Sequence, residues 1–112
     1  MKNFEEISLD IRRDIFKIVC KNRTGHLASS LSSVEILVSL YFGNVLRYNP
    51  SNPTWEERDR FIMSKGHAAL ALYYILARAG YYEKESINSF CMEGSIFCGL
   101  ATYGKIPGIE MT

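Results

Sequence analysis

The sequence lacks the features that mark secreted and membrane-spanning proteins. Its 112 residues include only three cysteines, and an odd number argues against a framework of disulfides. No apolar run follows residues 1–6, as a signal peptide would require. The most apolar stretch, residues 68–77, is too short to cross a bilayer. We therefore expect a protein of the reducing cytoplasm, with no membrane partner.

An excess of one charge and the common nucleotide motifs are also absent. The formal net charge is +1, so nothing in the composition favours binding to nucleic acid. Neither Gly-x4-Gly-Lys-Ser/Thr nor Gly-x-Gly-x-x-Gly after a strand occurs. Cys91 and Cys98 stand seven residues apart, and neither belongs to a close pair of zinc spacing. We expect these thiols to be buried or half-buried and assign no metal ligand in the chain.

What is present is typical of one small globular domain, which we place over residues 1–112. Hydrophobic residues make up 47% and charged residues 22%. Apolar residues at steps of three and four predict an amphipathic helix over residues 4–21. Ser32 and Glu35 have the spacing of a capping box, which predicts a second helix from Ser32 to about Phe42.

The second half of the chain predicts two more helices. Residues 68–79 are apolar on nearly every side, so this third helix must be buried all round, and Gly80 should end it. A short fourth helix is predicted over residues 83–90. The tail from residue 94 to 112 contains four glycines and a proline and is predicted to be loop.

Phe61, Ile62 and Met63 form a short apolar run, which predicts a buried, parallel-type strand. The charged residues 56–60 before it are interpreted as a solvated turn. A buried strand needs neighbours for its backbone hydrogen bonds, and the rest of the chain offers none that we can identify. The predicted fold class is therefore α/β, mostly helical with one strand, as a section of a larger structure whose sheet is incomplete here.

The two histidines, His26 and His67, are the strongest candidates for a site. Each follows a glycine and precedes a predicted helix. Glycine permits close approach of the backbone to a ligand, and a helix N-terminus offers free N–H groups to an anion. An imidazole at that place can donate to a phosphate or a hydroxyl. The alternative, that both are ordinary loop residues without a ligand, stays open on this pattern.

Several runs of the sequence together resemble the opening of transketolases. The resemblance covers almost the whole chain, and the Ser-Lys-Gly-His-Ala run distinguishes it from the similar deoxyxylulose-phosphate synthases. The runs are Thr24-Gly25-His26, Ser30-Leu31-Ser32, Val34-Glu35-Ile36-Leu37, Arg58-Asp59-Arg60-Phe61-Ile62-Met63-Ser64-Lys65-Gly66-His67-Ala68-Ala69, Leu72-Tyr73, Leu76-Ala77-x-x-Gly80 and Pro107-Gly108-Ile109-Glu110.

The resemblance implies a section of a three-layer thiamine diphosphate-binding module. Transketolases use thiamine diphosphate and a divalent metal, taken here as Mg²⁺, to move two-carbon ketol units between sugar phosphates. The cofactor lies between two modules, usually across a dimer interface. The position matching His26 contacts the sugar substrate, and the position matching His67 lies beside the cofactor and its diphosphate.

Two departures from the family pattern affect the expected activity. Gly99-Leu100-Ala101 stands where the family commonly has Gly-His-Pro, and leucine can neither donate nor accept a hydrogen bond. Ala28 replaces a usual glycine. The family's Gly-Ser-Leu-Gly-Gln-Gly stretch and its metal-holding Gly-Asp-Gly and Asn come after the part matched here. We therefore expect an incomplete cofactor and metal site, and a chain that is not catalytic alone.

Three hypotheses about function remain. The first is the truncated start of a transketolase without activity of its own. The second is an enzyme subunit, in a homo-oligomer or with a partner chain that carries the rest of the enzyme. The third is a non-catalytic interaction module, which Leu100 favours.

Overall fold

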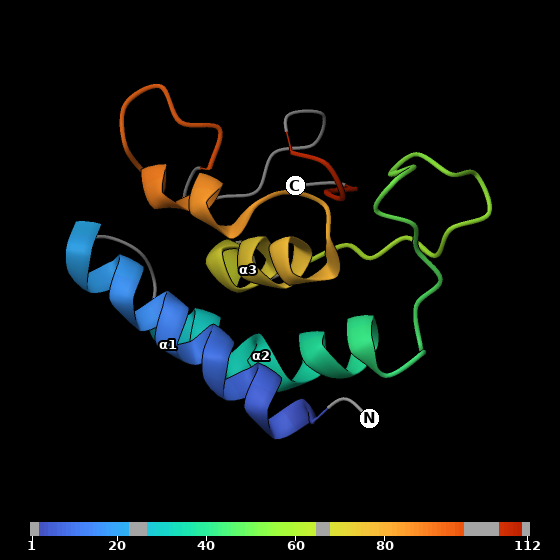
Figure 1. Cartoon of the computed structure of the whole chain (residues 1–112), viewed down its shortest axis with the longest axis horizontal. Coiled ribbons are helices and arrows are strands. Elements are labelled where there is room, and N and C mark those ends of the chain that lie inside the picture. The colour runs from blue at the N-terminus through green and yellow to red at the C-terminus, as the bar shows by residue number, and fades with distance from the viewer. Residues whose placement is uncertain (1–2, 23–26, 65–67, 98–105, 111–112) are drawn as a thin grey trace.

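The computed structural model describes residues 3–22, 27–64, 68–97 and 106–110. Four helical elements follow one another in this part: α1 (Phe4–Asn22), α2 (Leu27–Phe42), α3 (Ala69–Ala79) and the 3₁₀ helix η2 (Lys84–Ser89). α1 and α2 pack on each other and on one side of α3, while η2 and the tail lie on the other side (Figure 1). None of these described helices combines the length and apolar character needed to span a membrane.

α1 confirms the predicted amphipathic helix. A stripe of four isoleucines faces the core, each no more than 6% exposed. At the N-terminal end, Asn3 Oδ1 accepts hydrogen bonds from the backbone N–H groups of Glu5 at 3.0 Å and Glu6 at 3.2 Å, which satisfies two donors of the first turn. The buried isoleucines are Ile7, Ile11, Ile15 and Ile18.

α2 begins five residues before its predicted start. The capping box was the wrong signal, because Ser32 and Glu35 both lie inside the helix. Leu27 and Leu31 pack against the core and extend the buried face of the helix toward its N-terminus. Glu35 instead accepts hydrogen bonds from Arg12 on α1, and this partner holds the pKa of the Glu35 carboxyl below its usual value.

α3 confirms the helix that was predicted to be buried on every side. Its first eight residues, Ala69 to Leu76, are all buried. The helix ends at Gly80, whose φ of 108° lies in the left-handed region and whose N–H donates to the carbonyls of Ala77 and Leu76. Tyr73 packs edge-on to Phe97 with ring centroids 5.1 Å apart, so the tail covers the side of α3 that α1 and α2 leave open.

The predicted strand is not confirmed. No β-strand occurs among the described residues, and residues 60–64 make no backbone hydrogen bond to another described segment. Phe61 and Met63 pack against the core, whereas Ile62 between them is 51% exposed. The side chains thus alternate as in a strand, but a strand also requires a neighbouring backbone to pair with.

The short fourth helix predicted over residues 83–90 is present as the 3₁₀ helix η2. Cys91 is exposed, contrary to the predicted burial, and adopts a φ of 58° in a turn; Cys20 is exposed as well. Cys98 lies outside the described residues, and the described parts of the tail have no regular secondary structure, as predicted.

Replacing a leucine of α3 should destabilise the protein far more than replacing an exposed one. Leu76 is fully buried and Leu9 is 47% exposed. We expect Leu76→Ala to lower the free energy of unfolding by about 2–5 kcal/mol, because it opens a cavity, and Leu9→Ala by less than about 1 kcal/mol. Denaturant unfolding followed by circular dichroism measures both values. Equal losses would contradict the burial of α3.

Candidate functional site

The two histidines singled out from the sequence, His26 and His67, lie outside the described residues, as does Leu100. The bounds of the described helices nevertheless show which helix follows each histidine. α2 begins at Leu27, directly after His26, and the N-cap of α3 is Ala68, directly after His67. Each candidate therefore immediately precedes the N-terminal turn of an observed helix.

The N-terminus of α3 lies in a buried place. Ala68, Ala69 and Leu70 are at most 2% exposed. No side chain caps the helix there, and its first turn carries no acidic residue. The first N–H groups of a helix have no partner within the helix, and the helix dipole adds partial positive charge. These donors suit an anionic ligand.

Two buried polar atoms, one at the end of α1 and one near the start of α2, have no hydrogen-bond partner among the described residues. Asn22, at the end of α1, donates from Nδ2 to the carbonyl of Phe90 at 2.8 Å, but its Oδ1 accepts nothing. Ser30, in the first turns of α2, is fully buried, and its Oγ has no hydrogen bond. A buried polar group without a partner costs about 1–3 kcal/mol. A polar ligand reaching these atoms would recover that cost.

A buried ion pair joins the segment before α3 to the tail. The Nε and Nη2 of Arg58 donate to the two carboxylate oxygens of Glu110, each at 2.7 Å, and Nη1 donates to the carbonyl of Trp55 at 2.7 Å. The two side chains are only 8% and 12% exposed. The prediction of a solvated turn was therefore wrong for Arg58.

This pair was not predicted from the sequence, although both partners belong to runs that resemble transketolases. The signal that could have indicated the pair was a charged side chain inside each of these two runs. Arg58 and Glu110, however, are 52 positions apart, and no spacing rule would connect them. A paired arginine and carboxylate in two-point contact fixes direction as well as distance.

Tyrosines and a phenylalanine pack in an aromatic cluster beside the pair. Tyr41 lies 5.2 Å from Tyr48 and 6.0 Å from Phe61 between ring centroids, and Tyr48 stacks on Tyr81 at 6.2 Å. Burial raises the pKa of the Tyr81 hydroxyl to about 12, with smaller contributions from Tyr48 and Glu110. These hydroxyls therefore stay protonated near neutral pH and act as hydrogen-bonding groups rather than as bases.

The tail reaches Glu110 through a close approach that requires glycine. Gly108 has a φ of 92°, and a Cβ there would lie 3.0 Å from Leu76 Cδ2 and 3.1 Å from the ring of Tyr81. Ile106 and Ile109 on either side are buried. This part of the tail therefore packs against the C-terminal half of α3.

The described residues offer no ready-made metal site. Within residues 3–22, 27–64, 68–97 and 106–110, no group of three or more His, Cys, Asp or Glu side chains could hold a metal ion. No metal ligand can be assigned from this part of the chain.

Comparisons with known proteins place this chain in one class, the proteins with a thiamine diphosphate binding domain. The model of the transketolase thiamine diphosphate binding domain matches residues 5–112. The chain is 37% identical to the transketolase of Treponema pallidum over 107 residues, and 39% identical over 100 residues to one subunit of the apulose-4-phosphate transketolase of Phocaeicola vulgatus. A solved transketolase from Leishmania mexicana superimposes with a TM-score of 0.84 at 29% identity.

The chain belongs to the transketolase family, in its N-terminal thiamine diphosphate binding domain. The matches take in 95% of the chain but 16% of the Treponema transketolase, 89% but 35% of the Phocaeicola protein, and 97% but 16% of the Leishmania enzyme. The α/β class of the family fold is therefore supported, with its helical part described in this structure.

Removing the arginine of the buried pair should be costly. In Arg58→Met, the one cation left near Glu110 among the described residues is Arg60, whose Nη1 lies 3.9 Å from the carboxylate. Because the carboxylate stays buried without its two-point partner, we expect the free energy of unfolding to fall by about 3 kcal/mol or more. The exposed pair between Arg47 and Asp59 is the control, and Arg47→Met should cost less than about 1 kcal/mol. Similar losses in chemical denaturation would show that the Arg58 pair contributes no more than a surface contact.

Proposed function

We propose that this chain supplies the diphosphate side of a thiamine diphosphate site in a transketolase, an enzyme that moves two-carbon ketol units between sugar phosphates. Family membership supports the proposal. The structural observation that carries it is the buried N-terminus of α3, with no side-chain cap, directly after Gly66-His67. A diphosphate carries the negative charge that such donors favour.

The described residues fit the diphosphate and not, by themselves, a metal. The N–H groups of the first turn of α3 would donate to the negative oxygens, and His67 would donate to them from the preceding residue. Mg²⁺ would need carboxylate or amide ligands from polypeptide beyond the described groups. Thiamine diphosphate, when bound, supplies the carbon nucleophile that amino-acid side chains lack.

His26 is assigned to the substrate side. It stands directly before α2, four residues from the buried Ser30, whose Oγ has no partner. An imidazole and a hydroxyl at such a junction would donate to hydroxyl groups of a sugar phosphate. Leu100 replaces the histidine that the family commonly uses, so substrate binding would depend more strongly on His26.

The rest of the active site would come from further polypeptide. The Phocaeicola relative is named as one subunit of its transketolase, which supports a division of the enzyme between chains. The chain would act in the cytoplasm, together with a partner chain or a second copy, and would not carry out ketol transfer alone.

The two histidines provide a matched test of the cofactor assignment. Thermal unfolding of the chain, with and without thiamine diphosphate and Mg²⁺, measures binding to the folded state as a rise in Tm. We expect His67→Ala to reduce that rise by at least half, because a donor to the diphosphate is lost, and His26→Ala to leave it unchanged.

Other results would count against the proposal. A rise in Tm that both variants retain in full would remove His67 from the cofactor site, and an equal reduction in both would remove the distinction between the two sides. No rise in the unsubstituted chain, at cofactor concentrations into the millimolar range, would show that the diphosphate side does not form a binding site in this chain.

A further inference from the structure

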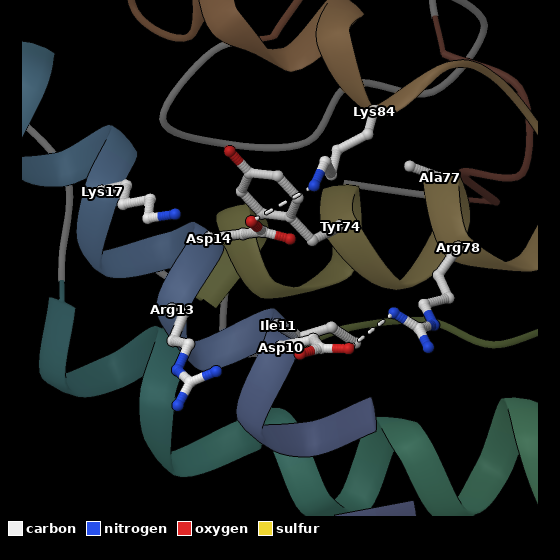
Figure 2. Close-up of a pocket in the computed structure, with 9 residues that line it drawn as sticks. All are labelled: Asp10, Ile11, Arg13, Asp14, Lys17, Tyr74, Ala77, Arg78 and Lys84. Atoms are coloured by element: carbon white, nitrogen blue, oxygen red, sulfur yellow. Dashed lines mark hydrogen bonds and ion pairs between the residues drawn. The ribbon is translucent and has the colours of Figure 1, made fainter. Parts of the chain in front are cut away.

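We propose that a groove between α1, α3 and η2 binds a small phosphate-bearing anion, apart from the thiamine diphosphate site. Two adjoining hollows of about 400 Å³ and 290 Å³ share the side chains of Asp14, Lys17, Tyr74 and Lys84. Figure 2 shows the first hollow, with its lining contributed by all three elements. None of the lining residues belongs to the groups assigned above to the cofactor or the substrate.

Tyr74 presents a hydroxyl without a hydrogen-bond partner to this groove. The residue is only 5% exposed, yet its ring lines both hollows. No hydrogen bond to its hydroxyl occurs within the described part of the chain. Burial, with a smaller contribution from Asp14, raises the pKa of the Tyr74 hydroxyl, so it keeps its proton and can donate. The hydroxyl oxygen itself is reached by solvent, so it can donate to a ligand that enters the groove.

The groove carries an excess of positive charge. Five cationic and three acidic side chains line the two hollows together, so the excess is two positive charges. Two of the cations are engaged, since Arg78 lies 3.3 Å from Asp10 and Lys84 lies 3.4 Å from Asp14. The cations are Arg13, Lys17, Lys21, Arg78 and Lys84.

Lys17 is the cation best placed to meet a ligand. It lines both hollows and has no ion pair among the described residues. Its ammonium group points toward the hollow in Figure 2, on the same side as the Tyr74 ring and the Asp14–Lys84 pair. A cation free of intramolecular partners can bind an anion without first breaking an existing contact.

These features together favour a phosphate group as the ligand of the groove. A phosphate near neutral pH carries close to two negative charges, which matches the excess in the groove. Its oxygens would accept from Lys17, from Lys84 and from the hydroxyl of Tyr74. Ile11 and Ala77 line the same hollow and provide apolar surface for a short carbon portion. The volume of the first hollow, about 400 Å³, falls within the roughly 300–1,000 Å³ typical of small-molecule sites.

Calorimetric titration of the whole chain tests the site, with inorganic phosphate and glycerol phosphate as probes at constant ionic strength. We expect saturable binding, and we expect Lys17→Gln and Tyr74→Phe each to weaken it about tenfold, as the loss of a hydrogen bond to a charged group would. Arg47→Gln removes a positive charge from a distant loop and should leave the affinity unchanged. Tighter binding of the ester would identify a phosphorylated small molecule, and equal binding would identify free phosphate.

Three results would overturn the assignment. The first is absence of saturation with either probe. The second is an effect of Arg47→Gln as large as that of Lys17→Gln, which would indicate general attraction by charge. The third is loss of phosphate binding in His67→Ala, which would place the anion at the thiamine diphosphate site instead. Retention of binding in His67→Ala keeps this site separate from the proposed function. Circular dichroism of Tyr74→Phe checks that the variant is folded.

Discussion

The burial of α3 on all sides is the constraint on which the rest of the structure depends. Eight consecutive residues of this helix are buried, so the helix is stable only when other segments surround it. The isoleucine stripe of α1 and the buried face of α2 cover one side, and Phe90, Phe97, Ile106 and Ile109 join the same core. Segments from both ends of the sequence therefore converge on a helix in the middle of the chain.

This arrangement determines where polar groups can act. Because the N-terminus of α3 lies inside the packed region, its N–H donors are held in place and shielded from water. Shielding strengthens the attraction between such donors and an anion, since the local dielectric constant is low. The Arg58–Glu110 pair then fixes the segment that enters α3 against the tail that lies on its far end. Packing thus holds together parts of the chain that precede and follow the helix.

Charges on the outside of the core serve a different purpose. Between α1, α3 and η2, acidic and basic side chains meet across the groove in partly exposed pairs, which contribute little stability one by one. Two carboxylates each pair with one cation, whereas Lys17 and the hydroxyl of Tyr74 have no partner within the part of the chain that the structure describes. The two proposed anion sites thus differ in kind, since backbone donors would form one and side chains the other.

The sequence by itself determined the helices, the buried character of α3 and the family. Periodicity of apolar residues predicted α1 and α3 because burial of a helix face is encoded locally, every three or four residues. Motif runs predicted the transketolase family, which the comparisons confirmed. Local signals failed where one spacing has two interpretations. Ser32 and Glu35 match a capping box, yet α2 begins earlier, at Leu27, where the partly buried Leu27 and Leu31 pack against the core.

Only the tertiary structure decided which polar groups meet. Arg58 and Glu110 lie 52 residues apart, and Tyr74 meets Asp14 and Lys17 from a different helix. Such contacts depend on how helices pack, and no short-range pattern records them. The apolar run at residues 61–63 illustrates the same limit of local patterns. Its alternation of buried and exposed side chains was encoded locally, but pairing as a strand depends on a neighbouring backbone that only the surrounding structure can supply.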